Sequence, residues 1–231
     1  MSTIAGQLAF FVGSYHLLKH NNGKGVMIGK LEDIDPRVVS VIGAGVAGTQ
    51  SIAKALENHA HVKVVDSSQQ KLDSLKSQFG TNNIEYILSN EESIQASIND
   101  SDLVIGSVYV VGKEAPRVVT REMLTSMSPG TVMVDVSIDQ GGCFESSRPT
   151  THDKPTFVEN DIVHYCVTNM PGAVPLTATQ ALNKATISYI EELANKGIER
   201  ALSENKHLKN GLNIQDGNIT HQGVKDSLEK I

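Results

Sequence analysis

Three glycines at the end of an apolar run are the first residues whose spacing suggests chemistry. Gly43, Gly45 and Gly48 follow residues 37–42 (RVVSVI) and open a segment with helical spacing from Val46. Gly43 would permit a tight turn, Gly45 would let the backbone approach a pyrophosphate, and Gly48 would let the helix pack closely on the strand. The pyrophosphate would lie on the positive end of that helix. The spacing predicts a dinucleotide-binding turn, and the alternative is a glycine turn that binds nothing.

An acidic residue at the end of the next predicted strand supports the first alternative. Asp66 ends residues 61–66 (HVKVVD) and lies 18 residues beyond Gly48, near the spacing of roughly 20 expected for an acid that binds a ribose. Its charge would repel a 2′-phosphate, so the pattern favours NAD over NADP. Lys71, one helical turn further on, is either a contact to the adenosine end of the cofactor or an ordinary solvated lysine.

A second cluster follows the fifth predicted strand. Ligands of doubly wound sheets bind beyond the carboxyl ends of the strands, so Asp139 is expected where a nicotinamide and its reaction partner would lie. A carboxylate there could accept a hydrogen bond from a substrate amine or balance positive charge during hydride transfer. The alternative is a turn or cap aspartate. Two further strand ends are expected at the same edge, with the residues Ser107, Val108, Tyr109, Thr168, Asn169 and Met170.

The remaining reactive residues favour structural roles. Cys143 and Cys166 have no metal-ligand spacing and are predicted to be reduced and near the core. His152 and His164 are expected near the same edge, each more in keeping with a structural than a catalytic role. The His, Cys, Asp and Glu spacings predict no metal site, and the context suggests no Ser-His-Asp arrangement.

Alternating apolar strands and helices must position these residues. The pattern predicts an α/β fold of the Rossmann type, a doubly wound parallel sheet covered on both faces. Expected strands are 37–42, 61–66, 84–88, 102–107, 131–136 and 163–167, and expected helices are 46–58, 69–79, 91–98 and 121–127.

Both ends of the chain depart from this alternation. Ile4, Leu8, Phe11, Tyr15 and Leu18 form one apolar face of a predicted opening helix, with Ser2 as its N-cap. After Pro171 a long helix over 177–194 is expected, then a hairpin at Asp216-Gly217 and a polar helix. The predicted organisation is a linking helix (1–20), a dinucleotide-binding domain (21–172) and the carboxy-terminal piece of a second domain (173–231).

Composition limits the class of protein. The 231 residues carry a net charge of −6 and are 39% hydrophobic, which argues against a nucleic-acid binder and for an ordinary globular chain. The first residues lack a signal-peptide pattern, and no apolar run approaches the roughly 20 residues of a membrane span. We therefore expect a cytoplasmic protein with no membrane or nucleic-acid partner.

The run VDVSIDQGGCFESSRPTTHDKPTF, followed by HYCVTNMPGAVPLTATQALNKAT, resembles bacterial alanine dehydrogenase. That family belongs with the alpha chain of pyridine nucleotide transhydrogenase, and the likeness covers essentially the whole chain. It implies NAD-dependent interconversion of L-alanine with pyruvate and ammonia, and a homo-oligomer. Asp139 matches the family's active-site aspartate. The resemblance implies cofactor contacts from Ser2, Val46, Asp66, Lys71, Ser89, Val108, Tyr109, Val136, Ser137, Ile138, Asp139, Arg148, Val167, Thr168, Asn169 and Met170.

The chain also departs from the family pattern. Family members carry a substrate-domain portion before the opening helix, with a substrate-binding Arg and Lys and a catalytic His that have no counterpart here. Glu192 matches a metal position of some members, but Lys196 replaces the partner histidine, so no metal is predicted. One hypothesis is an enzyme completed by a separately encoded amino-terminal half. The alternatives are a non-catalytic NAD-binding fragment or a transhydrogenase-like subunit. Without that half, the opening helix and the helix around Leu182 and Leu193 are expected to expose apolar surface and to drive self-association.

Overall fold

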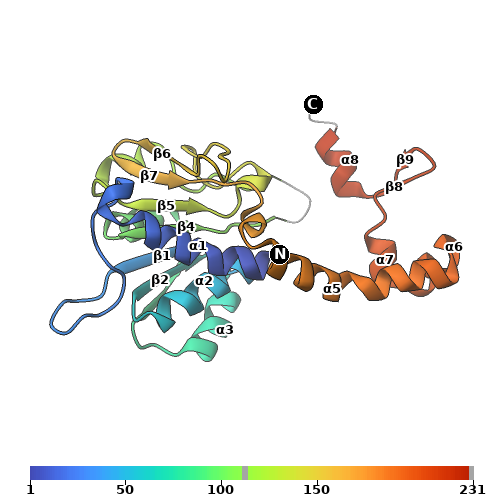
Figure 1. The fold of residues 1–231 in the computed structure, drawn as a ribbon, viewed down its shortest axis with the longest axis horizontal. Helices are drawn as coiled ribbons and strands as arrows, with labels where there is room; N and C mark the ends of the chain where they lie inside the picture. Colours follow the sequence, from blue (N-terminus) through green and yellow to red (C-terminus); the bar gives the residue numbers. More distant parts are fainter. Residues whose placement is uncertain (111–113, 229–231) are drawn as a thin grey trace. The chain divides into compact units, whose positions relative to one another are not determined.

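The computed structural model describes residues 1–110 and 114–228. Residues Ser2–Tyr109 and Glu114–Ala173 form one compact unit, and the residues from Val174 onward belong to a second. The first unit contains a seven-stranded sheet in the order β3-β2-β1-β4-β5-β7-β6 (Figure 1). Its strands are β1 (Val38–Ile42), β2 (His61–Asp66), β3 (Ile84–Leu88), β4 (Leu103–Gly106), β5 (Val132–Asp135), β6 (Thr156–Glu159) and β7 (Ile162–Tyr165). All neighbouring pairs are parallel except β6 with β7.

Helices cover both faces of this sheet, as the sequence predicted. Alternate residues of the strands, such as Val39 and Val41, join one apolar cluster with α1, α2 and α3. The intervening residues, such as Val104 and Met133, join a second cluster with α4 and the chain around Leu124. These helices are α1 (Ser2–His16), α2 (Val46–Glu57), α3 (Gln69–Phe79) and α4 (Glu91–Asn99).

Two local predictions were wrong. The helix expected over 121–127 is only a short 3-10 helix, Met123–Ser126. Pro129 disfavours helical backbone in the residue before it, and a segment this short does not offset the cost of starting an α-helix. The sequence analysis also missed β6, which pairs with β7 through Asn160 and Asp161, both at positive φ. An Asn-Asp pair between two apolar stretches is the signal of a two-residue hairpin turn that could have revealed it.

The opening helix buries its small residues. Ala5, Gly6, Ala9 and Gly13 are buried, together with Phe10 and His16. Glycine is required at position 6, because a β-carbon there would lie 2.1 Å from the carbonyl oxygen of Ala47 in α2. The larger apolar face is turned outward, and Phe11 and Tyr15 are 52% and 55% exposed. The expected exposure of this face is therefore confirmed for Phe11, Tyr15 and Leu18, whereas Ile4 and Leu8 are partly buried.

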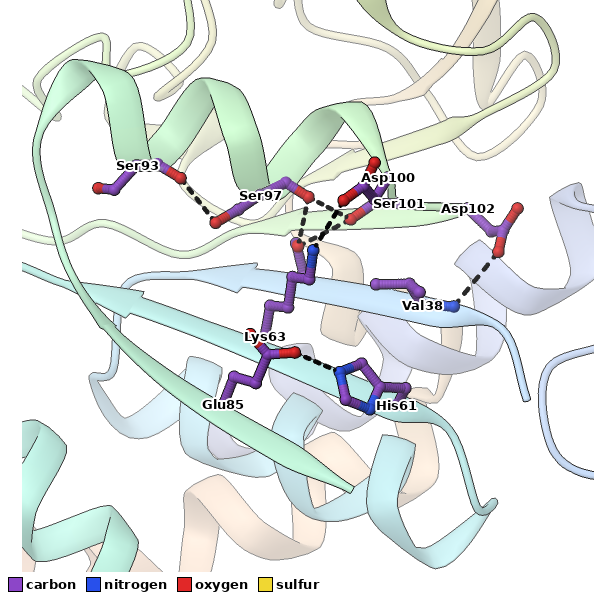
Figure 2. A network of polar contacts seen from close by, with 10 residues as sticks. Val38, His61, Lys63, Glu85, Ser93, Ser97, Asp100, Ser101 and Asp102 are labelled. Carbon is purple, nitrogen blue, oxygen red and sulfur yellow. Dashed lines mark hydrogen bonds and ion pairs between the residues drawn. The ribbon is translucent and has the colours of Figure 1, made fainter. Parts of the chain in front are cut away.

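Ion pairs and hydrogen bonds join side chains at the edge of the sheet where the strands begin (Figure 2). The Lys63 ammonium group lies 3.2 Å from a carboxylate oxygen of Asp100, and His61 Nε2 lies 2.6 Å from Glu85 Oε1. Asp102, just before β4, accepts a hydrogen bond from the Val38 amide at 3.2 Å and pairs with the Lys24 ammonium group at 2.9 Å. The hydrogen bond from Val38 to Asp102 joins the starts of β1 and β4.

The second unit contains a long helix and a hairpin. The long helix expected over 177–194 is α5 (Pro175–Lys196), and Gly197, at φ 74°, ends it. The turn at Asp216-Gly217 joins β8 (Ile214–Gln215) to β9 (Asn218–Ile219), which confirms the predicted hairpin. The remaining helices are α6 (Ile198–Glu204), α7 (Lys206–Asn210) and α8 (Gln222–Leu228). Residues 229–231 of the predicted closing helix lie outside the described part of the chain.

The Lys196 ammonium group binds Glu192 Oε1 at 2.6 Å and Glu204 Oε2 at 2.9 Å, and Asn205 donates to Glu192 Oε2 at 2.6 Å. Both oxygens of Glu192 therefore already have protein partners. Within residues 1–110 and 114–228, no His, Cys, Asp or Glu cluster is arranged to hold a metal ion.

In the same ranges, no helix is both long enough and apolar enough to cross a membrane.

Candidate functional site

The carboxyl ends of the parallel strands meet at one edge of the sheet, and nearly all the predicted site residues follow those ends. From β1 the chain winds outward to β2 and β3, and it then returns to β4 on the other side of β1. A crevice for a ligand forms where the strand order reverses in this way. The segments after β1 and β4 border that point, and the segments after β5 and β7 extend the same edge.

The glycine turn after β1 has the local geometry that its spacing predicted. Gly43 has a φ of 102°, a conformation that favours glycine. A β-carbon on Gly48 would lie 1.9 Å from the Gly43 carbonyl oxygen, so α2 can pack this closely only with glycine there. A β-carbon on Gly45 would have no atom within 4 Å. The turn therefore presents open backbone beside the N-terminus of α2, where the first amide groups have no partner inside the helix.

Asp66 lies beside this turn and is 7% exposed. Its carboxylate accepts hydrogen bonds from the amides of Ala44 at 2.7 Å and Ser68 at 2.8 Å. The ammonium group of exposed Lys71 lies 3.6 Å from Asp66 Oδ2. Ser89, at the end of β3, donates its amide to the Asp66 carbonyl oxygen at 2.9 Å. The four predicted contacts Gly43, Asp66, Lys71 and Ser89 are therefore neighbours on one side of the reversal point.

Asp139 lies on the other side of that point and is the exposed residue of a 3-10 helix, Ile138–Gln140. The backbone amide of Asn169 donates to both carboxylate oxygens of Asp139, at 3.1 and 3.3 Å. Asn169 itself has a φ of 51°, which turns its amide toward Asp139. The carboxylate is thus held at the edge while remaining open to solvent. In this position it can accept a hydrogen bond from a bound molecule or interact with its positive charge.

Asp135 is a residue that the sequence analysis missed. It ends β5, is 0% exposed, and accepts hydrogen bonds from the amides of Ser137 and Cys143, both at 2.9 Å, and from the Ser147 hydroxyl at 2.6 Å. Burial raises the pKa of Asp135, while the bonds from Ser147, Cys143 and Ser137 act in the opposite direction. An acid at the end of the apolar run VMVD, shortly before Gly141-Gly142, is the signal that could have revealed it.

The segments after β4 and β5 are joined directly. The Ser137 hydroxyl donates to the Val108 carbonyl oxygen at 2.8 Å, and the Val136 amide donates to the Gly106 carbonyl oxygen at 2.8 Å. The side chains of Ser137 and Ile138 are buried, whereas Tyr109 is exposed. The predicted contacts Val108, Tyr109, Val136, Ser137 and Ile138 therefore form one continuous border, to which Ser137 and Ile138 contribute mainly backbone.

The other predicted contacts differ in how accessible they are. Val46 is 63% exposed at the start of α2, and exposed Ser2 begins α1, which packs on α2 at Gly6. The Arg148 guanidinium group lies over the Phe157 ring at 4.1 Å. The side chains of Val167 and Met170 are buried, so only their backbone could face a ligand. Thr168, which lies between them, donates its amide to the Thr150 carbonyl oxygen at 3.3 Å.

His164 and the two cysteine residues have structural surroundings, whereas His152 is exposed. Burial lowers the pKa of His164 to about 4, and its ring contacts the Ser146 hydroxyl at 2.8 Å and stacks on Phe157. Cys143 and Cys166 are buried and form no disulfide, which confirms the prediction for both. Burial is the main cause that raises the pKa of Cys143 well above its ordinary value and that of Cys166 to about 12. Their thiols therefore stay protonated near neutral pH.

These features define a doubly wound α/β domain with a dinucleotide-binding turn. Residues 9–222 match the family described as "Alanine dehydrogenase/PNT, C-terminal domain". The chain therefore belongs to the alanine dehydrogenase and pyridine nucleotide transhydrogenase family, and the matched part is the NAD-binding domain of that family.

Individual relatives agree with this assignment. The chain is 43% identical to an alanine dehydrogenase of Halomonas elongata over 98% of its length and 44% identical to one of Mycolicibacterium smegmatis over 99%. It spans 61% and 62% of the length of these two relatives.

Solved structures show the same relationship. A structure of an L-alanine dehydrogenase aligns with the whole chain at a TM-score of 0.92 and 40% identity, and the chain covers 63% of it. A transhydrogenase structure from Sinorhizobium meliloti aligns over 96% of the chain and 61% of its own length, at a TM-score of 0.75 and 23% identity, and so shares the fold.

Proposed function

We propose that the chain binds NAD along the carboxyl edge of its sheet and contributes this site to an L-alanine dehydrogenase. The single observation that carries the proposal is the open glycine turn, with Asp66 beside it, in a chain 43–44% identical to named alanine dehydrogenases. The turn and the N-terminus of α2 suit a pyrophosphate, because amide groups and a positive helix end favour negative charge. Asp66 suits the adenosine ribose and disfavours a 2′-phosphate.

Bound NAD would supply the hydride acceptor for the oxidation of L-alanine, whose carbon–nitrogen product water converts to pyruvate and ammonia. The chain's own residues would orient the cofactor and the substrate and polarise the reacting group. The segments Val136–Ile138 and Val167–Met170 would border the nicotinamide end, and the Asp139 carboxylate would face the reacting amine. A negative charge there stabilises positive charge that grows on the nitrogen as the hydride leaves. The Asn169 amide keeps that carboxylate oriented in the described structure.

The test separates cofactor binding from turnover. NAD and NADP are titrated calorimetrically into the chain, and alanine-dependent NADH formation is followed separately. Turnover is measured for the chain alone and for the chain preceded by the amino-terminal part of the Halomonas elongata relative. We expect binding of NAD in preference to NADP, and turnover at least when the additional part is present. Failure to bind either nucleotide contradicts the proposal.

Asp139→Asn is the informative variant for turnover. Loss of the charge should lower turnover at least about 100-fold while NAD affinity changes little, because the stabilised charge develops only during the reaction. Asp153→Asn is the matched control, since Asp153 is an exposed carboxylate in a nearby loop. Equal effects of the two substitutions would remove Asp139 from the proposed reaction. Binding without turnover under every condition would favour the alternative of a non-catalytic NAD-binding module.

We also propose that the outward face of α1 takes part in assembly, either between copies of the chain or with a separately encoded amino-terminal half. The exposure of Phe11 and Tyr15 supports this proposal. Sedimentation velocity of the wild type and of a Phe11→Ser, Tyr15→Ser double variant tests it. A monomeric wild type that also fails to bind the amino-terminal part would contradict it.

A further inference from the structure

The strongest unexplained feature of the first unit is the buried carboxylate of Asp135. It lies at the end of β5, directly before the segment that carries Asp139, and it belongs to no ion pair between described residues. A buried carboxyl group without a cation is costly unless hydrogen bonds compensate it. Its partners therefore indicate what it does.

Those partners come from both ends of one loop. Before the 3-10 helix, the Ser137 amide donates to Asp135 Oδ1 at 2.9 Å. After it, the amides of Cys143 and Phe144 donate to Oδ2 at 2.9 and 3.4 Å, and the Ser147 hydroxyl does so at 2.6 Å. One carboxylate thus closes residues 136–144 into a fixed loop, with Asp139 at its tip.

The loop sequence is shaped around this carboxylate. Gly141 and Gly142 have φ values of 92° and 81°, and a β-carbon on Gly142 would lie 2.9 Å from Asp135 Oδ2. The Gly142 amide donates to the Ser137 carbonyl oxygen at 3.1 Å, which closes the loop a second time. The chain passes over the carboxylate only because glycine is present.

We infer that Asp135 is a positioning residue, whose carboxylate holds the segment Val136–Asp139 in place against the nicotinamide half of the cofactor. The inference rests on the proposed NAD site. Asp66 and the glycine turn serve the adenosine and pyrophosphate part, whereas the loop that Asp135 closes serves the other end. Its loss should therefore affect one half of the ligand and leave the other half unaffected.

Asp135→Asn is the direct test. The substitution preserves size, but its NH2 group must face an N–H donor in either orientation, because amides point at both oxygens. NADH and ADP-ribose, which lacks nicotinamide, are titrated into the full chain. We expect NADH affinity to fall about tenfold and ADP-ribose affinity to change less than about twofold. Hydrogen exchange should rise in residues 136–147 and stay unchanged in residues 43–48.

Asp102→Asn is the matched control, because Asp102 is another buried carboxylate next to a strand, at the opposite edge of the sheet (Figure 2). It should weaken neither ligand. If Asp135→Asn does not fold, Ser147→Ala removes one donor and should weaken NADH selectively by about threefold. Equal weakening of NADH and ADP-ribose, or no weakening, would overturn the inference. A wild-type chain that binds neither ligand would instead refute the proposed function.

Discussion

The two edges of the sheet use acidic side chains in different ways. Where the strands begin, Asp102 and Asp100 pair with the ammonium groups of Lys24 and Lys63. Glu85 contacts the His61 ring there (Figure 2). Where the strands end, Asp66, Asp135 and Asp139 accept hydrogen bonds mainly from backbone amides. A cation neutralises a carboxylate, but an amide orients it and leaves its charge available. The same residue type therefore forms ion pairs at one edge and, at the other, presents oriented carboxylates beside the proposed NAD site.

The largest expected effect is that of a substitution in the glycine turn, where two glycine variants distinguish a loss of packing from a loss of NAD binding. Gly48→Ala should destabilise the fold by about 3 kcal/mol and abolish NAD binding, because its β-carbon would overlap the Gly43 carbonyl oxygen. Gly45→Ala, where no atom lies within 4 Å, should change stability by less than about 0.5 kcal/mol yet weaken NAD at least about tenfold. Denaturant unfolding and calorimetry measure both. A Gly45→Ala variant with wild-type affinity would show that the turn does not approach the pyrophosphate.

An acid titration sharpens the comparison at the buried His164 of β7, whose ring contacts the Ser146 hydroxyl and not a carboxylate. Its pKa is near 6.5 in an unfolded chain and about 4 in the folded one, because burial disfavours its charged form. The unfolded state therefore binds more protons as pH falls from about 6.5 to about 4, and stability should fall by an amount on the order of 3 kcal/mol.

Buried His16 adds to this loss, while burial of Asp135 acts in the opposite direction. Urea unfolding of the wild type and of His164→Gln measures the contribution of His164. The variant should be less stable near neutral pH but should show a smaller loss in acid. Parallel pH profiles for the two proteins would show that His164 does not set the acid limit.

Removing a charge from the edge where the strands begin should affect stability alone. Asp102→Asn leaves the largely buried Lys24 ammonium group without its anionic partner, with only the Ser101 carbonyl oxygen still bound, and should cost about 2 kcal/mol of unfolding free energy. NAD affinity should stay within about twofold of the wild type, because the change is made far along the strands from the glycine turn. A marked loss of affinity at wild-type stability would contradict the division of roles between the edges.

The smallest expected effect concerns cofactor choice at the other edge. Asp66→Asn removes the charge that disfavours a 2′-phosphate and should weaken NAD about tenfold while weakening NADP less. The ratio of the two dissociation constants is the measurement, and Asp73→Asn on the exposed surface of α3 is the control. An unchanged ratio would mean that Asp66 serves mainly to hold the Ala44 and Ser68 amides.

The sequence by itself predicted the parts of this protein that depend on near neighbours. Three such parts are the alternation of the strands, the turn at Gly43–Gly48 and the acid at position 66. Each is a local pattern, because backbone sterics and the burial of alternate side chains determine it within a few residues. The sequence also predicted which edge of the sheet carries the candidate site, because the carboxyl ends of parallel strands lie at the same edge.

Tertiary structure alone decided which groups complete the site. Asn169 reaches Asp139 across 30 positions of the chain, and Asp135 binds amides that come near it only after the glycine pair folds back. The opening helix also buries Gly6 rather than the predicted apolar face at Phe11 and Tyr15, because close backbone approach to α2 requires glycine there. Such contacts depend on packing between distant segments, and no local periodicity encodes them.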